Sequence, residues 1–173
     1  MSFTTLAGNV VDCILLGCVS EKAPLATGQR LPLRDLYTSD LWTKRRAYAE
    51  HHEALGCPWL IVSAFHGIRL PGYESGAYDR KIGDYGGKAD RAAWSGMAAY
   101  NFRGLLPGAP DRQLVVEIHA GVEYRDSLSG PLMDQGVTLV NPLAGLPGIG
   151  AQKHRYLELM ANVRLLSLFG DAS

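Results

Sequence analysis

Two histidines stand at the ends of apolar segments, and a glycine follows each of them within two residues. His66 lies in LIVSAFHG and His119 lies in QLVVEIHAG. An imidazole held at a strand end can donate a hydrogen bond or move a proton near neutral pH. Each could instead be an ordinary turn residue, because Gly67 and Gly121 could serve only to supply a positive φ. Two such strand ends in one chain favour a site.

Two further stretches carry groups that bind or react. Cys18 and Lys22 lie in GCVSEK, where the thiol is a candidate nucleophile or ligand contact and the amine could hold a phosphate or a carboxylate. YDRK contributes Tyr78 for stacking and Asp79 as a carboxylate base. Each stretch has a plainer alternative, since a lone lysine is usually solvated and YDRK could be a surface turn.

The glycines near the end of the chain could hold an anion. LAGLPGIGAQ contains Gly148 and Gly150 and ends on Gln152, but it lacks the G-K-[ST] ending of a nucleotide-binding P-loop. Glycines that precede a helix can present backbone N–H groups to an anion. A tight turn between a strand and a helix would explain the same residues.

The composition excludes several classes. Lys+Arg and Asp+Glu are equal at 17 each, so the chain is not a bulk nucleic-acid or membrane-surface binder. No His, Cys, Asp and Glu residues have the spacing of metal ligands, and we expect neither a metal nor another cofactor. A serine hydrolase fits poorly without a G-x-S-x-G motif. No apolar run could span a membrane and no signal peptide is recognisable, so we expect a cytoplasmic protein without a membrane partner.

Strands and helices alternate along the chain. The apolar pattern predicts a single domain over residues 1–173 with a core of about 11–169. The predicted strands cover residues 11–19, 58–64, 113–121 and 137–141, and the predicted helices cover residues 40–55, 88–106 and 124–135 and a last segment after residue 150. This order favours a three-layer α/β/α fold with a short, mainly parallel four-stranded sheet. His51 and His52 are expected on a solvated helix face.

Ligands bind outside the carboxyl ends of the strands in open α/β sheets. The unusual loops all follow predicted strands, so they should meet at one edge of the sheet. We therefore expect one cavity there, lined by Lys22, Tyr37, His66, Asp79 and His119.

The ordered motifs of the chain resemble those of a bacterial and phage family that is largely described as a domain of unknown function. They are GCVSEK, DLYTS, SAFHGI, AYDRKI, IHAGVEYRDSL and PLAGLPGIGAQ, and they extend over roughly Leu15 to Tyr156. Phe65 stands where the family commonly has lysine, and Pro147 is an extra residue in the glycine stretch. The family is distantly similar to the uracil-DNA-glycosylase superfamily, which includes antiviral enzymes that remove modified phage bases.

The resemblance implies a DNA glycosylase-like enzyme that flips a modified base out of DNA and hydrolyses its N-glycosidic bond. Asp79 or Asp35 would orient water, His119 would donate a hydrogen bond to the leaving base, and His66 would orient or bond a reacting group. Tyr37, Phe65, Tyr78 or Tyr85 would stack on the base. Phosphate contacts would come from Lys22, Arg45 and Lys81. The other substrate-binding candidates are Cys18, Ser39, Ser63, Gly121, Tyr124, Gly148, Gly150 and Gln152.

Two alternatives remain open. Related transferases modify a deazaguanine base in transfer RNA through a motif that is similar to Cys18, Lys22, Tyr37 and Ser39, so the chain could be a transferase or binding protein for a modified base or nucleotide. It could also be a non-catalytic nucleic-acid-binding module. The neutral net charge favours an isolated base or small ligand, whereas the KRR run at residues 44–46 favours nucleic acid. We expect a nucleic-acid partner, with DNA favoured over RNA.

Overall fold

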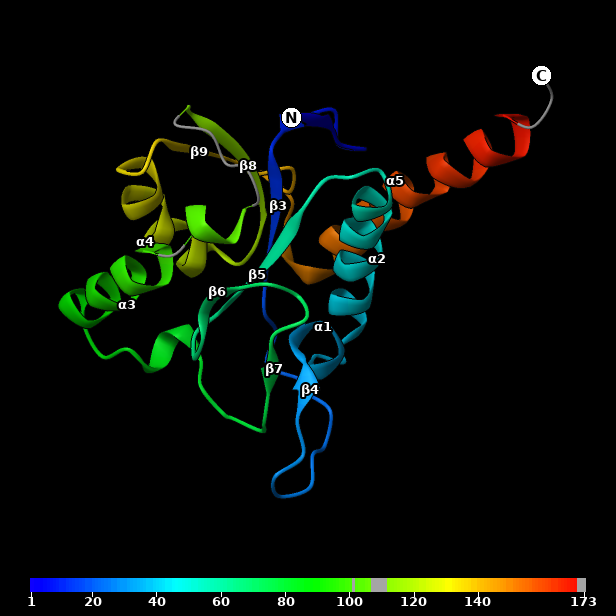
Figure 1. The fold of residues 1–173 in the computed structure, drawn as a ribbon. Helices are drawn as coiled ribbons and strands as arrows, with labels where there is room; N and C mark the ends of the chain where they lie inside the picture. Colours follow the sequence, from blue (N-terminus) through cyan, green and yellow to red (C-terminus); the bar gives the residue numbers. More distant parts are fainter. Residues whose placement is uncertain (101, 107–111, 171–173) are drawn as a thin grey trace.

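The computed structural model describes residues 1–100, 102–106 and 112–170. Its centre is a five-stranded sheet in the order β6-β5-β3-β8-β9 (Figure 1). Four strands are parallel: β3 (Cys13–Gly17), β5 (Trp59–Ser63), β8 (Leu114–His119) and β9 (Val137–Val140). The short strand β6 (Gly67–Arg69) pairs antiparallel with β5 at one edge. The expected α/β fold with a mainly parallel sheet is confirmed, but the sheet has five strands and not four.

The additional strand arises where SAFHG turns the chain back on itself. The Ser63 hydroxyl accepts hydrogen bonds from the backbone N–H groups of Phe65 and His66, at 3.2 and 3.3 Å. Gly67 then adopts a φ of +68°, and a Cβ at this residue would lie 3.0 Å from the Cα of Ala98. Only glycine fits this position without strain. A three-residue strand is too short to show the alternation from which strands are predicted.

Helices cover both faces of the sheet (Figure 1). One face packs against α3 (Lys88–Tyr100) and α4 (Val122–Met133), and the other packs against α2 (Asp40–Ala54) and α5 (Gly148–Gly170). Ser39 caps α2 by accepting a hydrogen bond from the Trp42 N–H, as its position before the helix predicts.

Smaller elements position the loops. The strands β1 (Phe3–Thr4) and β2 (Val10–Val11) form an N-terminal hairpin, and β4 (Leu31–Pro32) pairs with β7 (Glu74–Ser75). The described residues also form three single-turn helices, namely α1 (Leu33–Leu36), η1 (Ile82–Asp84) and η2 (Arg103–Leu105). Helix α3 therefore ends before residue 106, where the sequence predicted its end. Within the described ranges, no helix is long and apolar enough to cross a membrane.

The strand order reverses between β3 and β8. The chain leaves β3 for β5 on one side, and later returns to place β8 on the other side. Gly17 ends β3 so close to β8 that a Cβ on it would lie 2.6 Å from the Cβ of Ala120. Such a reversal is where open α/β sheets bind ligands, at the carboxyl ends of the strands.

Candidate functional site

Three tyrosines, a serine and a thiol gather at the carboxyl ends of β3 and β5. We call Cys18, Tyr37, Ser63, Tyr78 and Tyr124 the rim cluster. The Tyr78 hydroxyl lies 2.5 Å from that of Tyr37 and 2.8 Å from that of Ser63. The Cys18 sulfur lies 3.1 Å from the Tyr124 hydroxyl. Residues from separate segments therefore meet at this edge, as the loop positions predicted.

The tyrosines of the rim cluster are held in their neutral form. Burial raises the pKa of Tyr37, and the adjacent Cys18 and Tyr78 raise it further. Burial and Cys18 likewise raise the pKa values of Tyr78 and Tyr124. A neutral phenol both donates and accepts a hydrogen bond, so the cluster can match a ligand edge that carries donors and acceptors.

An exposed ring lies against this cluster. Phe65 stacks on Tyr78 with ring centroids 4.9 Å apart and planes inclined by 18°, and 52% of Phe65 is exposed. We call Phe65 and Tyr78 the aromatic platform. The Lys22 amine lies 4.5 Å from the centre of the Tyr78 ring and donates a hydrogen bond to the Ser20 carbonyl. Lys22 forms no ion pair with any described residue, so its charge remains free to meet an anion.

His66 borders the aromatic platform. Its ring centroid lies 4.8 Å from that of Phe65 and 5.1 Å from that of Tyr78, edge-on to both. The Nε2 atom lies 2.7 Å from the hydroxyl of Ser75, which is 2% exposed. The sequence predicted His66 but not Ser75, because an isolated serine in an irregular loop carries no signal.

The two candidate carboxylates differ in their surroundings. Asp79 is exposed beside Tyr78 and makes no contact with the described side chains that would orient it. Asp35 is also exposed, but it forms an ion pair of 2.6 Å with Arg46. Asp35 therefore does not join the rim cluster. Lys81, a predicted phosphate contact, is exposed.

His119 is buried between its strand and the helices α2 and α5, and it does not line the expected cavity. It is fully buried; Nε2 donates to Glu117 at 2.8 Å and Nδ1 accepts from the Tyr156 hydroxyl at 2.6 Å. Successive residues of a strand face opposite ways, so Val116 and Ile118 face α3 and α4 while His119 faces α2 and α5. Neither ring nitrogen is free for a leaving base, which corrects the expectation that His119 lines one cavity with His66.

Glu117 is the centre of a buried hydrogen-bond network that the sequence did not predict. Its oxygens accept from Tyr48 at 2.6 Å, His119 at 2.8 Å, Thr5 at 2.7 Å and Asn9 at 2.7 Å. Together with Tyr156, these residues form what we call the glutamate network. Burial alone would raise the pKa of Glu117, but the hydrogen bonds from His119, Tyr48 and Asn9 lower it to about 2.

Arg45 and His52 are buried, where the sequence predicted solvent or phosphate contact. Arg45 is 4% exposed and donates to the Gly17 carbonyl at 3.1 Å and to the Gln152 side chain at 3.2 Å. His52 is 1% exposed; Nδ1 donates to the Tyr48 carbonyl and Nε2 accepts from the Leu6 N–H. Their helix α2 is covered by α5 and the N-terminal residues, which the local sequence pattern cannot reveal.

The remaining predicted residues lie in a turn or at the beginning of a helix. Tyr85 donates to the Ala64 carbonyl at 2.7 Å and so supports the turn after β5. Gly121 is the N-cap of α4, and Gly148 begins α5 with a φ of +69°. Gly150 is exposed in the first turn of α5.

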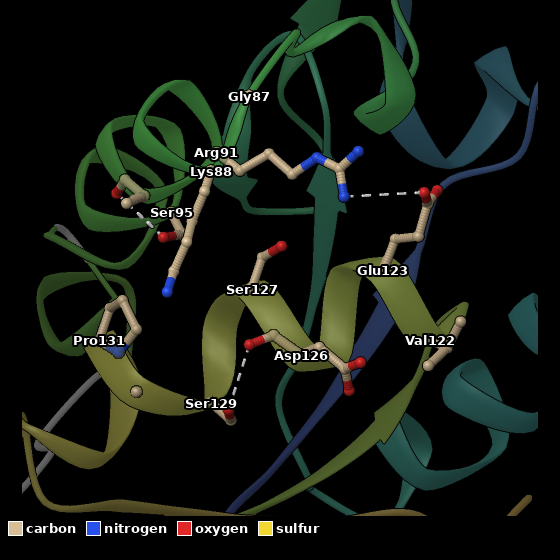
Figure 2. A pocket seen from close by; sticks show the side chains of 12 residues that line it. Gly87, Lys88, Arg91, Ser95, Val122, Glu123, Asp126, Ser127, Ser129 and Pro131 are labelled. Carbon is tan, nitrogen blue, oxygen red and sulfur yellow. Dashed lines mark hydrogen bonds and ion pairs between the residues drawn. The ribbon is translucent and has the colours of Figure 1, made fainter.

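A separate groove lies between α3 and α4 (Figure 2). It has a volume of about 710 Å³ and is lined by basic, acidic and hydroxyl side chains, among them Lys88, Arg91, Glu123 and Asp126. Figure 2 shows Arg91 extended toward Glu123, at a distance of 4.0 Å. None of the residues predicted from the sequence lines this groove.

Comparison with known proteins identifies one family. The model of a family of unknown function, DUF6884, matches residues 13–158. This range includes β3 to β9 and the first half of α5, and with them the whole rim cluster and the aromatic platform. None of the curated proteins compared with the chain matches it.

Proposed function

The chain belongs to the DUF6884 family of unknown function, and we propose that it is a DNA glycosylase-like enzyme. It would bind a modified base that has been extruded from DNA and hydrolyse the N-glycosidic bond of that base. Enzymes that act on a base must take it out of the stack and hold it in a fitted site. The site must therefore offer a flat apolar surface on which the base can stack, polar groups beside that surface, and a positive charge for the phosphate backbone of the DNA.

The observation that carries this proposal is the aromatic platform beside the rim cluster. A half-exposed Phe65 ring offers a face on which a base can stack, and such stacking contributes about 1–3 kcal/mol per base. Tyr78, which is only partly buried, brings a hydroxyl from the rim cluster close to where the polar edge of the base would lie. Lys22 brings a positive charge for a phosphate.

The fold is compatible with the distant similarity to uracil-DNA glycosylases. That fold has a short parallel sheet with helices on both sides and its site at the carboxyl ends of the strands. The parallel strands β5, β3, β8 and β9 and the two helical layers match this description. Cys18 and Tyr124 of the rim cluster follow β3 and β8 and meet at the reversal of strand order, where ligand sites of open sheets occur.

The chemistry needs a water molecule and a proton acceptor. Water attacks C1′ of the sugar, the bond from C1′ to the base nitrogen breaks, and the electron pair leaves with the base. The proton taken from water then returns to the base or to solvent. Asp79 and His66 are the candidate acceptors, and the hydroxyl of the partly buried Tyr78 would stabilise the charge on the leaving base. Selective removal of a modified base would suit antiviral defence.

Base release from phage DNA tests the proposal. The purified chain is incubated with DNA from phages that carry hypermodified bases and with unmodified host DNA, and released bases are identified by mass spectrometry. We expect release from at least one modified DNA. Phe65→Ala should lower release at subsaturating DNA by about 5- to 150-fold, because a stacking contact is lost. Tyr100→Ala, at an 80% exposed tyrosine on α3, is the matched control and should leave release unchanged.

Two results would reject the proposal. One is the absence of base release from every modified DNA, with the fold intact. The other is release that Phe65→Ala leaves unchanged. Release from modified transfer RNA and not from DNA would assign the site to RNA.

The Cys18 thiol supports a second candidate, a transferase for a modified base. It lies within the rim cluster, bonded to the Tyr124 hydroxyl, where a nucleophile could reach a bound base. A covalent adduct on Cys18, detected by mass spectrometry of the intact chain, would support a transferase over a hydrolase.

A further inference from the structure

We propose that His66 is the general base of this site, and that the buried Ser75 is the positioning residue that fixes its tautomer. The inference rests on the proposed function and specifies which group takes the proton from water. The sequence left this role open between the carboxylates and assigned no role to Ser75.

The hydrogen bonds of Ser75 determine where His66 carries its proton. The Ser75 hydroxyl donates to the Gly76 carbonyl at 2.9 Å. Its oxygen then has only lone pairs to offer to Nε2 of His66, 2.7 Å away, so Nε2 carries the hydrogen. The other ring nitrogen, Nδ1, is left with a lone pair and has no hydrogen-bond partner among the described residues. An imidazole in this state can accept a proton.

The turn after β5 holds the ring beside the aromatic platform. The Ser63 hydroxyl accepts the N–H of His66, which ties the backbone of the turn to the rim cluster. Edge-on contacts with Phe65, Tyr73 and Tyr78 surround the ring at centroid distances of 4.8 to 5.2 Å. A base that stacks on the platform would therefore place its sugar near a group that is already positioned, as general catalysis requires.

The charges around His66 keep it neutral. Partial burial lowers the pKa of its ring, and Arg69 on β6 and Arg30 before β4 lower it further. The rings of Phe65, Tyr73 and Tyr78 bring no charge, and no described carboxylate forms an ion pair with the ring. His66 is thus in its proton-accepting form at neutral pH and is held in place by its neighbours. Asp79, the other candidate base, has no contact with the described side chains that would orient it.

The step balances without a further reactant. Nδ1 of His66 accepts one proton of the water molecule as the oxygen forms its bond to C1′. The C1′–N bond breaks and its electron pair stays on the base. His66 then returns the proton to the base or to solvent, and the neutral imidazole is restored.

The pH dependence of base release tests this assignment. We expect the wild-type rate to fall on the acid side, below the ordinary pKa of histidine, as His66 becomes protonated. His66→Gln should lower the rate at pH 7.5 by at least about 100-fold, the range for a lost general base, and should remove the acid limb. Asp79→Asn should keep that limb. His154→Gln, at a 74% exposed histidine side chain, is the matched control and should leave the profile unchanged.

A nitrogen-15 NMR spectrum of the histidine rings tests the tautomer without any substrate. The wild type should show His66 protonated at Nε2 and bare at Nδ1 above its pKa. Ser75→Ala should mix the two tautomers and lower base release by about 5- to 10-fold, with the melting temperature as a check on the fold. His66 protonated at Nδ1 in the wild type would overturn the inference.

The possible failures are distinguishable. Suppose that the wild type releases a base and that His66→Gln has the same rate and the same acid limb. This result would reject His66 as the general base but would leave the proposed function standing. Loss of the acid limb in Asp79→Asn alone would assign the role to the carboxylate. No base release by the wild type from any nucleic acid rejects the proposed function and this inference with it.

Discussion

Replacing Glu117 with glutamine should destabilise the protein by about 3 kcal/mol at pH 7. The Glu117 carboxylate is fully buried and accepts four hydrogen bonds, two at each oxygen. The amide of the glutamine variant has nearly the same shape, but it replaces one of these oxygens by an NH₂ group that would face two of the donors. Thr5 can rotate its hydroxyl to accept, but the amide of Asn9 then faces another amide. Hydrogen bonds to charged groups contribute roughly 1.5–3 kcal/mol each, so losing one or two gives about this total.

The pKa of Glu117 expresses the effect of the same hydrogen bonds and gives a similar magnitude. It is lowered from 4.5 to about 2 in the folded chain. A pKa that is lower by one in the folded chain than in the unfolded chain corresponds to about 1.4 kcal/mol, so this carboxylate contributes about 3 kcal/mol of stability at neutral pH. A lowered pKa means that the unfolded chain binds the proton first as the pH falls. This stability is therefore complete above about pH 4.5 and is lost as the pH falls toward 2.

Urea unfolding of the wild type and Glu117→Gln at pH 7, 4.5 and 3 measures both effects. The difference in unfolding free energy should be largest at pH 7 and smaller at pH 3, and the melting temperature should fall by roughly 6–12 °C at pH 7. Glu21→Gln makes the same charge change at an exposed position and serves as the control. A difference below about 0.5 kcal/mol at pH 7, or one that does not shrink in acid, would refute the reasoning.

Three further predictions concern the turn, a buried histidine and the thiol. Gly67→Ala should lower the free energy of unfolding in urea by about 2 kcal/mol or more, because the new side chain would have a left-handed φ and would press against Ala98. Gly72→Ala is the control and should have little effect, because a Cβ there meets nothing within 4 Å. Burial lowers the pKa of His52, so as the pH falls the unfolded chain binds a proton before the folded chain does. The free energy of unfolding should therefore decrease below about pH 6.5, and His52→Gln should reduce this decrease when unfolding is measured across that pH range. Cys18→Ser should keep most of the base release, because hydrolysis needs no thiol, and complete loss with an intact fold would point to the transferase.

The sequence predicted the four parallel strands because each is a run of apolar residues between turn signals. It also predicted that the loops after β3 and β5 meet, since carboxyl ends of parallel strands share an edge. Cys18, Ser63 and Tyr78 came together for this reason. The general location of the candidate site therefore followed from strand direction alone.

The orientation of individual side chains was harder to predict. His119 was placed at the rim because it ends a strand, but the pleat turns it to the face that also carries Glu117. A carboxylate two residues before the histidine, inside an apolar strand, was the available signal of a buried polar face. Its partners Thr5, Tyr48 and Tyr156 belong to distant segments, and no local pattern connects them.

The glutamate network also constrains how the chain acquires its structure during synthesis. Thr5 and Tyr48 contact Glu117 across 112 and 69 residues, and Tyr156 reaches His119 from helix α5. A nascent chain that has not yet extended beyond Tyr156 can form β3, β5 and β8 but lacks one end of this network. Contacts of such long sequence separation form late, so the final cooperative step of folding must await release of α5 from the ribosome. Until then the strands and the rim loops would be exposed to proteases and to other unfolded chains.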